Sequence, residues 1–305
     1  MTFDLVVVGG GPGGYVAAIR AAQLGSKTAL VEMGALGGVC LNRGCIPSKA
    51  LLDSTAIFSS VADGNVHGVK AEGLRLDWRA LQKRRANIVA RLTGGVGHLL
   101  EKAGVETVQG RGRVLSPEEV KVGKRTLKTT AVILATGSRP MELPHIPFDG
   151  DRVIGSREAL TLREVPQSLG VIGGGAIGLE MGSVYARAGS KVTVFEMEGE
   201  IIPLMDPDLG RALRKSLARS GLEILTSTRV EGAQVGPKGV VLSWERGGEA
   251  GKTMVERVLV AVGRRPSKGG VDVASLGIET DAGGFVLVDR GPRIPRRCRS
   301  AGVSL

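Results

Sequence analysis

The sequence predicts an α/β protein built from two doubly wound parallel sheets. Three observations lead to this prediction. The chain has 305 residues, more than one average domain. A strand–glycine turn–helix–strand pattern occurs twice, and further strand-like runs alternate with helical segments around the two copies. Apolar residues make up 42% of the chain and charged residues 23%, as is typical of globular proteins.

The repeated pattern relates two segments by a constant offset of 173 − 9 = 164 residues. In each copy an apolar strand leads into three glycines spaced Gly-x-Gly-x-x-Gly, then into a helix and a second strand that ends in glutamate. The glycines are Gly9, Gly11 and Gly14 in the first copy and Gly173, Gly175 and Gly178 in the second, and the glutamates are Glu32 and Glu196. One such spacing is weak evidence, but two copies that match in context are strong evidence.

This pattern is typical of Rossmann-like dinucleotide-binding domains. The first glycine permits the tight turn, the second lets the backbone approach a pyrophosphate, and the third lets helix pack on strand. The helix N-terminus then holds the phosphates. Each glutamate lies 32 − 14 = 18 residues after the last glycine, where a carboxylate accepts ribose hydroxyls and favours NAD over NADP. Two sites indicate two dinucleotides, most economically FAD and NAD. The alternative is that the glycines only serve tight packing.

The remaining elements follow from periodicity and turn signals. Residues 46–103 should be mostly helical, with an apolar stripe that packs against the core. Another helix should follow Asp206-Pro207, residues 136–140 should form a turn, and the Pro-rich segment 140–147 marks a domain boundary. The stripe comprises Leu81, Ile88, Leu92, Val96 and Leu99, and the further strands are residues 105–109, 131–135, 222–225 and 257–262.

Composition and charge exclude some classes of protein. Aromatic residues make up only 3%, too few for a nucleic-acid reader that stacks bases. No apolar run reaches the roughly 20 residues of a membrane span, and Asp4 stands where a signal peptide would be basic. We therefore expect a cytoplasmic protein. The net charge is +11, with five arginines in residues 290–299. This tail could bind nucleic acid electrostatically, or it could be an end of little functional meaning.

Two of the three cysteines, Cys40 and Cys45, follow directly on the first copy of the repeat, and Cys298 lies alone in the tail. A zinc site needs about four ligands, and the three histidines (His67, His98 and His145) are far apart in the sequence, so we expect no metal. Pro47 suits the first turn of a helix, whose N-terminus favours a cysteine thiolate. A redox-active disulfide fits this pair better than two unpaired buried thiols.

These motifs together carry a family resemblance. The stretch Gly-Gly-x-Cys-x-x-x-x-Cys-x-Pro-Ser-Lys, the two glycine patterns, Ala135-Thr-Gly137 and Gly263-Arg-x-Pro266 resemble the class I pyridine nucleotide–disulfide oxidoreductases. Within that family, residues 40–52 and 173–182 most resemble the lipoamide dehydrogenases. The resemblance runs from residue 3 to about residue 289, nearly the whole chain, and its motifs are specific.

The resemblance implies roles for individual residues. Cys40 would exchange with the dithiol substrate, Cys45 would contact the flavin, and Lys49 and Glu180 would form an ion pair beside it. The FAD-binding positions would be Gly9, Gly11, Gly14, Glu32, Lys49, Gly112, Thr136 and Gly137. The NAD-binding positions would be Gly173, Gly175, Ile177, Gly178, Glu196, Val230, Gly263 and Arg264. The implied reaction passes electrons from dihydrolipoamide through the disulfide and FAD to NAD.

The resemblance also implies a domain plan. We expect an FAD-binding domain at 1–142, an NAD-binding domain at 143–264, the start of a segment that returns to the FAD domain at 265–289, and a basic tail foreign to the family at 290–305. The family partners would be a lipoyl-bearing protein of a 2-oxo acid dehydrogenase or glycine cleavage complex and a second copy of the chain, with no nucleic acid and no membrane.

The sequence departs from the family after residue 289. The Gly-Asp of the returning segment and the C-terminal dimerisation domain with its catalytic His–Glu pair have no counterpart in it. We therefore expect a truncated or frameshifted chain with impaired activity. Two alternatives remain, an inactive nucleotide-binding fragment and a related reductase. Glu196 and Ala176 disfavour a glutathione reductase, which carries arginines and a tyrosine there, and a mercuric reductase stays open.

Overall fold

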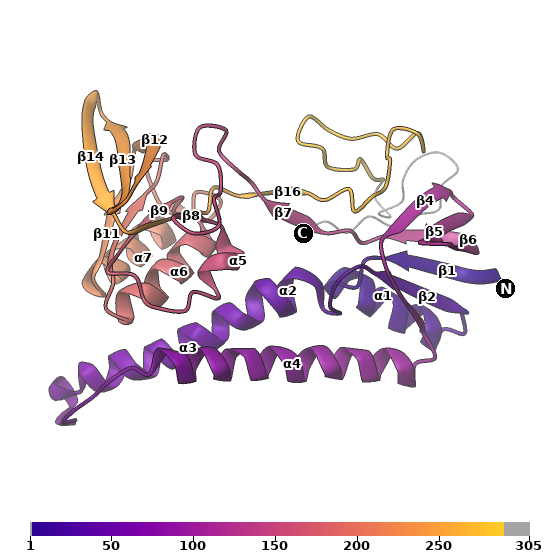
Figure 1. The fold of residues 1–305 in the computed structure, drawn as a ribbon, viewed down its shortest axis with the longest axis horizontal. Helices are drawn as coiled ribbons and strands as arrows, with labels where there is room; N and C mark the ends of the chain where they lie inside the picture. Colours follow the sequence, from indigo (N-terminus) through magenta and orange to yellow (C-terminus); the bar gives the residue numbers. More distant parts are fainter. Residues whose placement is uncertain (1, 290–305) are drawn as a thin grey trace. The chain divides into compact units, whose positions relative to one another are not determined.

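The structure of the chain is a computed structural model that describes residues 2–289 (Figure 1). The predicted basic tail, with Cys298, lies outside the described residues. The described part forms two compact units. The first comprises residues 2–46, 87–139 and 264–289, and the second comprises residues 47–86 and 140–263.

The first unit is built on a six-stranded sheet with the strand order β3-β2-β1-β6-β5-β4 (Figure 1). The pairs among β3, β2, β1 and β6 are parallel, and β6, β5 and β4 form an antiparallel meander. The helix α1 (Pro12–Gln23) connects β1 to β2. The strands are β1 (Thr2–Val8), β2 (Thr28–Glu32), β3 (Glu106–Gln109), β4 (Gly112–Ser116), β5 (Glu119–Val122) and β6 (Arg125–Leu134).

The second unit is built on a five-stranded parallel sheet with the order β11-β10-β9-β15-β8, beside an antiparallel sheet β12-β13-β14. The strands are β8 (Val153–Ile154), β9 (Ser168–Ile172), β10 (Lys191–Phe195), β11 (Leu222–Leu225), β12 (Thr228–Gly236), β13 (Gly239–Arg246), β14 (Glu249–Val255) and β15 (Arg257–Val260), and the helices are α5 (Ser156–Ala159), α6 (Ala176–Arg187) and α7 (Pro207–Arg219). The predicted fold class, with two doubly wound parallel sheets, is confirmed.

The predicted helical region contains α2 (Gly38–Arg43), α3 (Cys45–Ala62), η1 (Gly64–His67) and α4 (Trp78–Lys102). The apolar stripe predicted on α4 is wrong in part, because Leu92 and Leu99 are 38% and 52% exposed. Leu81 packs in the core of the second unit, whereas Val96 and Leu100 pack in that of the first. One helix thus serves two cores, and its buried side does not follow a single line.

One further feature differs from the sequence predictions. Residues 138–140 form the strand β7 (Ser138–Pro140), which pairs with β16 (Arg264–Pro266) where a turn was expected. Residues 47–86 belong to the second unit, whose core includes Leu51 and Trp78. After β16 the chain belongs to the first unit, and Val271 is buried in its core.

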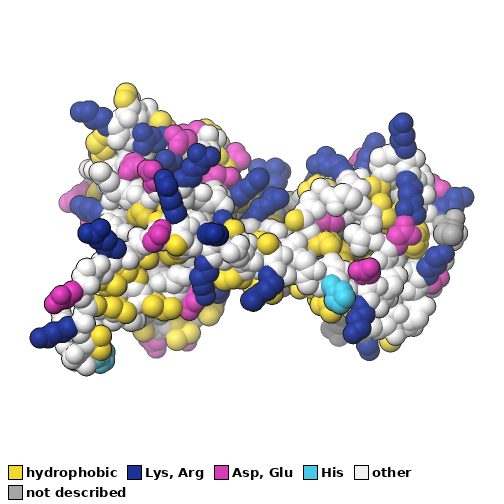
Figure 2. All heavy atoms as spheres, turned by 60° about the horizontal axis from the view of Figure 1, so that its bottom comes forward, with side chains coloured by type: hydrophobic (Ala, Val, Ile, Leu, Met, Phe, Trp, Pro, Cys, Tyr) yellow, Lys and Arg dark blue, Asp and Glu magenta, His cyan; other side chains and the backbone are white. Residues whose placement is uncertain are grey.

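The surface carries charges of both signs. On the face in Figure 2, lysine and arginine side chains lie among acidic ones rather than over a single element.

Candidate functional site

The first glycine turn links β1 to α1. Gly9 has φ +109°, and a Cβ atom there would overlap the carbonyl oxygen of Ala135, where β6 ends. A Cβ atom on Gly14 would overlap the carbonyl oxygen of Gly9, so the third glycine lets α1 pack on the turn. Gly11 is the N-cap of α1, and no described side chain caps that end. The helix N-terminus is therefore open to an anion.

The second glycine turn repeats this geometry between β9 and α6. Gly173 also has φ +109°, and a Cβ atom there would lie 2.6 Å from the carbonyl oxygen of Ala261. A Cβ atom on Gly178 would overlap the carbonyl oxygen of Gly173. In contrast, a Cβ atom on Gly175 would meet no described heavy atom within 4 Å. A ligand can approach the backbone there, beside Ile177 in the first turn of α6.

The two glutamates accept hydrogen bonds from the two turns in the same way. Glu32 Oε2 accepts a hydrogen bond from the Gly10 N–H at 2.6 Å, and Glu196 Oε2 accepts one from the Gly174 N–H at 2.5 Å. The other carboxylate oxygen of each accepts the N–H two residues later, at 2.7 and 2.8 Å. Because each oxygen has a second lone pair, both carboxylates can still accept ribose hydroxyls.

The loop of residues 33–37, which leads into the cysteine-bearing helix α2 and is called the cysteine loop below, packs on the first glycine turn. The Gly37 N–H donates to the Gly10 carbonyl oxygen at 2.8 Å. Gly38 has φ +56°, and a Cβ atom there would lie 2.6 Å from the Cα atom of Gly11. This approach requires glycine and brings the start of α2 directly onto the phosphate turn.

The two cysteines occupy successive helices. Cys40 lies in α2 and is half-buried, whereas Cys45 is the first residue of α3 and is exposed. Gly44 links the two helices, and Pro47 lies in the first turn of α3, as the sequence analysis predicted. The helix continues to Ala62.

Lys49 and Glu180, which are 131 residues apart in the sequence, meet in the second unit. The Lys49 Nζ atom lies 2.6 Å from Glu180 Oε1. Lys49 lies one helical turn after Cys45 on α3, and Glu180 lies on α6 in the helix that follows the second glycine turn. The structure therefore forms the ion pair that the family resemblance implied.

Three other predicted positions lie in the first unit. Gly112 begins β4 against the Val8 and Val31 side chains, with 3.1 and 3.2 Å between their Cγ1 atoms and a Cβ atom built on it. The Thr136 hydroxyl donates to the Ser267 carbonyl oxygen at 2.6 Å, and Gly137 follows it with φ +69°. Thr136 therefore fastens the returning segment to the end of β6.

The predicted NAD-lining positions are not all in the second unit. Val230 is buried in its core on β12, and Gly263 is its last residue. Arg264 belongs to the first unit, and its guanidinium donates to the Ser138 hydroxyl and carbonyl oxygens at 2.8 and 2.7 Å. Burial lowers the pKa of Arg264 from its usual value.

Three residues that shape these sites were not predicted from the sequence. Gly10 and Gly174 supply the N–H groups that the glutamates clasp, and the constant offset of the repeat relates them. Asn42, between the cysteines, donates hydrogen bonds to the carbonyl oxygens of Ala35, Leu36 and Gly38, just before and at the start of α2. Its position inside the cysteine motif was the one available signal.

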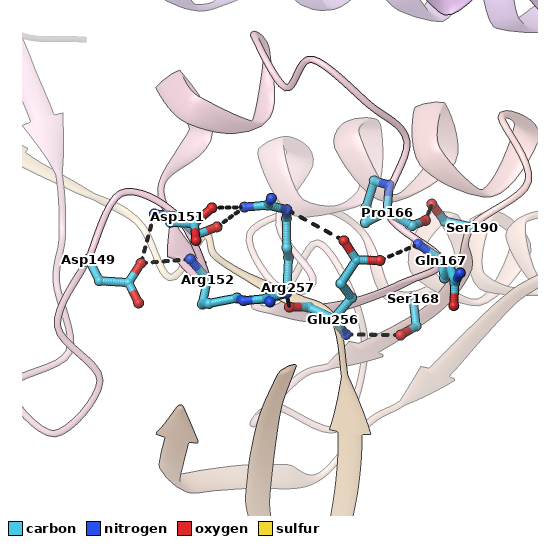
Figure 3. A network of polar contacts seen from close by, with 9 residues as sticks. All are labelled: Asp149, Asp151, Arg152, Pro166, Gln167, Ser168, Ser190, Glu256 and Arg257. Carbon is cyan, nitrogen blue, oxygen red and sulfur yellow. Dashed lines mark hydrogen bonds and ion pairs between the residues drawn. The ribbon is translucent and has the colours of Figure 1, made fainter. Parts of the chain in front are cut away.

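A separate polar network lies at the other end of the second sheet (Figure 3). Arg257, which begins β15, donates to Asp151 Oδ1 at 2.6 Å, and Glu256 Oε2 accepts the Gln167 N–H at 2.8 Å. Ser168, which begins β9, accepts the Glu256 N–H at 3.0 Å. Ligands of open α/β sheets bind beyond the carboxyl ends of the strands. This network joins amino ends, so we assign it to stability.

The described residues contain neither a metal-binding cluster nor a membrane-spanning helix. Within residues 2–289 there is no group of three His, Cys, Asp or Glu residues that could hold a metal ion. No helix in this part of the chain is long and apolar enough to cross a membrane.

The chain resembles curated proteins along most of its length. It is 43% identical over 291 residues to the dihydrolipoyl dehydrogenase of Geobacillus stearothermophilus, covering 94% of this chain and 62% of that protein. It is also 43% identical over 295 residues to the mitochondrial dihydrolipoyl dehydrogenase 1 of Arabidopsis thaliana and to a leghemoglobin reductase of Glycine max, covering 58% and 56% of them. The chain thus spans about 60% of the length of these relatives.

The fold resembles a solved flavoprotein. The HOCl-induced flavoprotein disulfide reductase RclA from Escherichia coli superposes with a TM-score of 0.83 at 24% identity, covering 99% of this chain and 67% of that one. At this identity the likeness concerns the fold alone.

The family model of the pyridine nucleotide-disulphide oxidoreductases matches residues 3–296. The match continues to residue 296, beyond the end at 289 that we expected, in a part of the chain that the structure does not describe. The resemblance to dihydrolipoyl dehydrogenases is confirmed by the curated relatives. The chain belongs to the pyridine nucleotide-disulphide oxidoreductase family, whose members are FAD- and NAD-dependent oxidoreductases.

Proposed function

We propose that the chain passes electrons from a dithiol such as dihydrolipoamide, through a Cys40–Cys45 disulfide and FAD, to NAD. The observation that carries this proposal is the packing of the cysteine loop on a dinucleotide turn, with a built Cβ atom on Gly38 only 2.6 Å from the Gly11 Cα atom. Because the loop touches the turn, the thiols belong to the same site as the first nucleotide.

The described residues fit two dinucleotides. Each glycine turn presents an uncapped helix N-terminus to a pyrophosphate and a carboxylate to a ribose. We assign FAD to the first turn, because the cysteine loop packs on that turn, and NAD to the second. The FAD set is Gly9, Gly11, Gly14, Glu32, Lys49, Gly112, Thr136 and Gly137. The NAD set is Gly173, Gly175, Ile177, Gly178, Glu196, Val230, Gly263 and Arg264.

The cysteines carry the exchange with substrate. As the two S–H bonds of the substrate dithiol are lost, its sulfurs join in a disulfide, the Cys40–Cys45 bond breaks, and two cysteine thiols form, so atoms and electrons balance. Cys40 is the cysteine that exchanges with the substrate dithiol, and Cys45 is the one that faces the flavin. When bound, FAD accepts the electron pair from the dithiol and passes it to NAD as hydride. The ion pair with Glu180 orients the Lys49 ammonium.

A second candidate function is nucleotide binding without turnover. The geometry of the two glycine turns and of their glutamates bears on binding alone. The chain spans about 60% of the length of the curated relatives.

The finer assignments rest on the family alone. We propose a cytoplasmic protein that serves a lipoyl-bearing protein of a 2-oxo acid dehydrogenase or glycine cleavage complex. A homodimer is the family's assembly. The alternative activity is that of a mercuric reductase.

Thiol counting tests the proposal. Denatured protein should show about one free thiol before reduction and all three cysteines after it, and Cys40→Ser or Cys45→Ser should abolish this difference. Three free thiols in aerated protein, or a bound zinc ion, would overturn the redox assignment. NADH formation from dihydrolipoamide then separates a turning-over enzyme from a binding chain.

A further inference from the structure

The Asn42 side chain makes four hydrogen bonds at the centre of the cysteine motif, of which the longest runs from its Nδ2 atom to the Ala35 carbonyl oxygen at 3.5 Å. Its Nδ2 atom donates to the carbonyl oxygens of Leu36 and Gly38, both at 2.9 Å. Its Oδ1 atom accepts the hydroxyl of Thr93, on α4, at 3.4 Å. The two carbonyl acceptors on one side and the hydroxyl donor on the other fix the orientation of the amide.

The loop that Asn42 holds is fastened at three further points. The Gly34 N–H donates to Glu32 Oε1 at 2.7 Å, and its carbonyl oxygen accepts Gln109 Nε2 at 3.2 Å. The Gly37 N–H donates to the Gly10 carbonyl oxygen. The loop is thereby tied to β2, to β3 and to the first glycine turn.

The helix α2 depends on these contacts. It has six residues, and isolated helices much shorter than ~12 residues are marginal in water. The position of Cys40 is therefore set by what holds α2 rather than by α2 itself. Asn42 is the side chain that joins the last turn of α2 to the fastened loop and to α4.

We propose that Asn42, braced by Thr93, is a positioning residue that holds the Cys40 thiol in reach of Cys45 and so favours the disulfide over the dithiol. This inference rests on the proposed function. Two thiols held in place have a higher effective concentration towards each other than two on a loose segment, so the equilibrium shifts towards the disulfide.

The experiment uses the full 305-residue chain in buffers of reduced and oxidised glutathione. The reaction is two cysteine thiols plus glutathione disulfide giving the Cys40–Cys45 disulfide plus two glutathiones. We expect Asn42→Ala and Asn42→Asp to lower its equilibrium constant about tenfold, equivalent to about 30 mV, and Thr93→Val to lower it by about threefold. Asn42→Asp keeps the side-chain size but sets oxygen against two carbonyl oxygens.

Two controls separate positioning from a general loss of structure. Asn87→Asp, on the exposed side of α4, introduces the same charge change away from the loop and should leave the constant within about twofold. Alkylation of the thiols against pH should slow in Asn42→Asp more than in Asn42→Ala, because only the former places a negative charge near Cys40. A loss of stability alone would not separate these two variants.

The outcomes are distinct. Equilibrium constants for both Asn42 variants within twofold of the parent, or an equal shift in Asn87→Asp, overturn the inference and leave the proposed function intact. A parent chain that forms no disulfide in any glutathione buffer overturns the proposed function itself. If the Asn42 variants do not fold, Thr93→Val decides, and an unchanged constant there overturns the inference.

Discussion

The two glycine turns share their hydrogen bonds but differ in what covers them. In both, a returning loop donates an N–H to the carbonyl oxygen of the second turn residue, from Gly37 to Gly10 and from Ile202 to Gly174. In the first turn the donor is a glycine at φ +92°, whereas in the second Ile202 takes φ +47°, which a β-branched residue rarely adopts. The same contact is thus made once with and once without a glycine.

The difference lies in where the returning loop leads. The first loop enters the cysteine helix, and Gly38 packs against Gly11. In the second copy, Gly175 has open space around its Cα atom. We infer that the covered turn serves a cofactor that stays beside the thiols, whereas the open turn serves a nucleotide that exchanges with solvent.

The largest expected effect is a loss of stability when a methyl group is added to either glycine turn. Gly14→Ala and Gly178→Ala should each lower the free energy of unfolding by about 3 kcal/mol, because the new methyl overlaps a backbone carbonyl that cannot move aside. Urea denaturation measures this. Gly94→Ala, in the helix α4 with no described atom within 4 Å of its built Cβ atom, should raise stability slightly. Unchanged midpoints in both turn variants would show that helix and turn do not pack as described.

The second effect concerns the hydrogen bonds that Glu196 accepts from the second turn. The parent chain should bind NADH at least tenfold (~1.4 kcal/mol) more tightly than NADPH, because the Glu196 carboxylate repels a 2′-phosphate. Glu196→Gln should lose this preference and also about 2 kcal/mol of stability, because an amide N–H would face a backbone N–H. Titration of both nucleotides and urea denaturation measure the two losses.

Glu198→Gln is the matched control for this prediction. It removes a negative charge two residues away on an exposed side chain, while its backbone N–H still donates to Glu196. Its stability should match that of the parent. Equal or tighter binding of NADPH by the parent chain would contradict the assignment of Glu196 to the ribose.

The third effect separates the open turn from the covered one. Gly175→Ala should leave stability unchanged, since its φ is −80° and the methyl enters open space. NADH affinity should fall about tenfold, because the methyl occupies the path of the pyrophosphate. Gly11→Ala should weaken FAD rather than NADH. An NADH affinity that responds to Gly11→Ala but not to Gly175→Ala would exchange the two cofactor assignments.

Both turns could be predicted from the sequence because each turn depends on the backbone conformation of a few neighbouring residues. A glycine at φ +109° or under a helix has no substitute, so the pattern survives in the sequence and its duplication is visible. The parallel strands beside the turns are buried on both faces and appear as apolar runs, such as Val6–Val8. Glu32 and Glu196 were found by their distance from the glycines.

Other features left little or no local signal. The sheet β12-β13-β14 was missed, since β14 is exposed along most of its length and shows no apolar alternation. The pairing of Lys49 with Glu180 spans 131 residues, so only the family resemblance suggested it. The domain boundaries remain a prediction, and the inclusion of residues 47–86 in the second unit depends on burial of Leu51 and Trp78 far from their sequence neighbours.

The amino ends of the two sheets offer a final contrast. At the start of β1, Asp4 Oδ2 accepts the Lys27 N–H at 2.7 Å. At the corresponding end of the second sheet, Asp151 and Arg257 form an ion pair within the wider network of Figure 3. The hydrogen bond from the Arg257 side chain, and then its charge, hold the pKa of Asp151 below its usual value.

The smallest expected effect is therefore a pH dependence confined to the second unit. Because the pKa of Asp151 is lowered by folding, the pair stabilises the fold above the unfolded pKa of about 3.9, and this contribution is lost as the pH falls through the folded pKa. The Asp151 side chain is 71% exposed, so solvent screening limits the contribution to less than about 1 kcal/mol. Asp151→Asn should lower the melting temperature slightly at pH 7 and converge with the parent towards pH 2, whereas Glu249→Gln, an exposed carboxylate on β14, should do neither. Melting curves across this range, with added NaCl in a second series, decide the matter. A destabilisation by Asp151→Asn that persists undiminished at low pH would assign its role to the backbone turn rather than to the ion pair with Arg257.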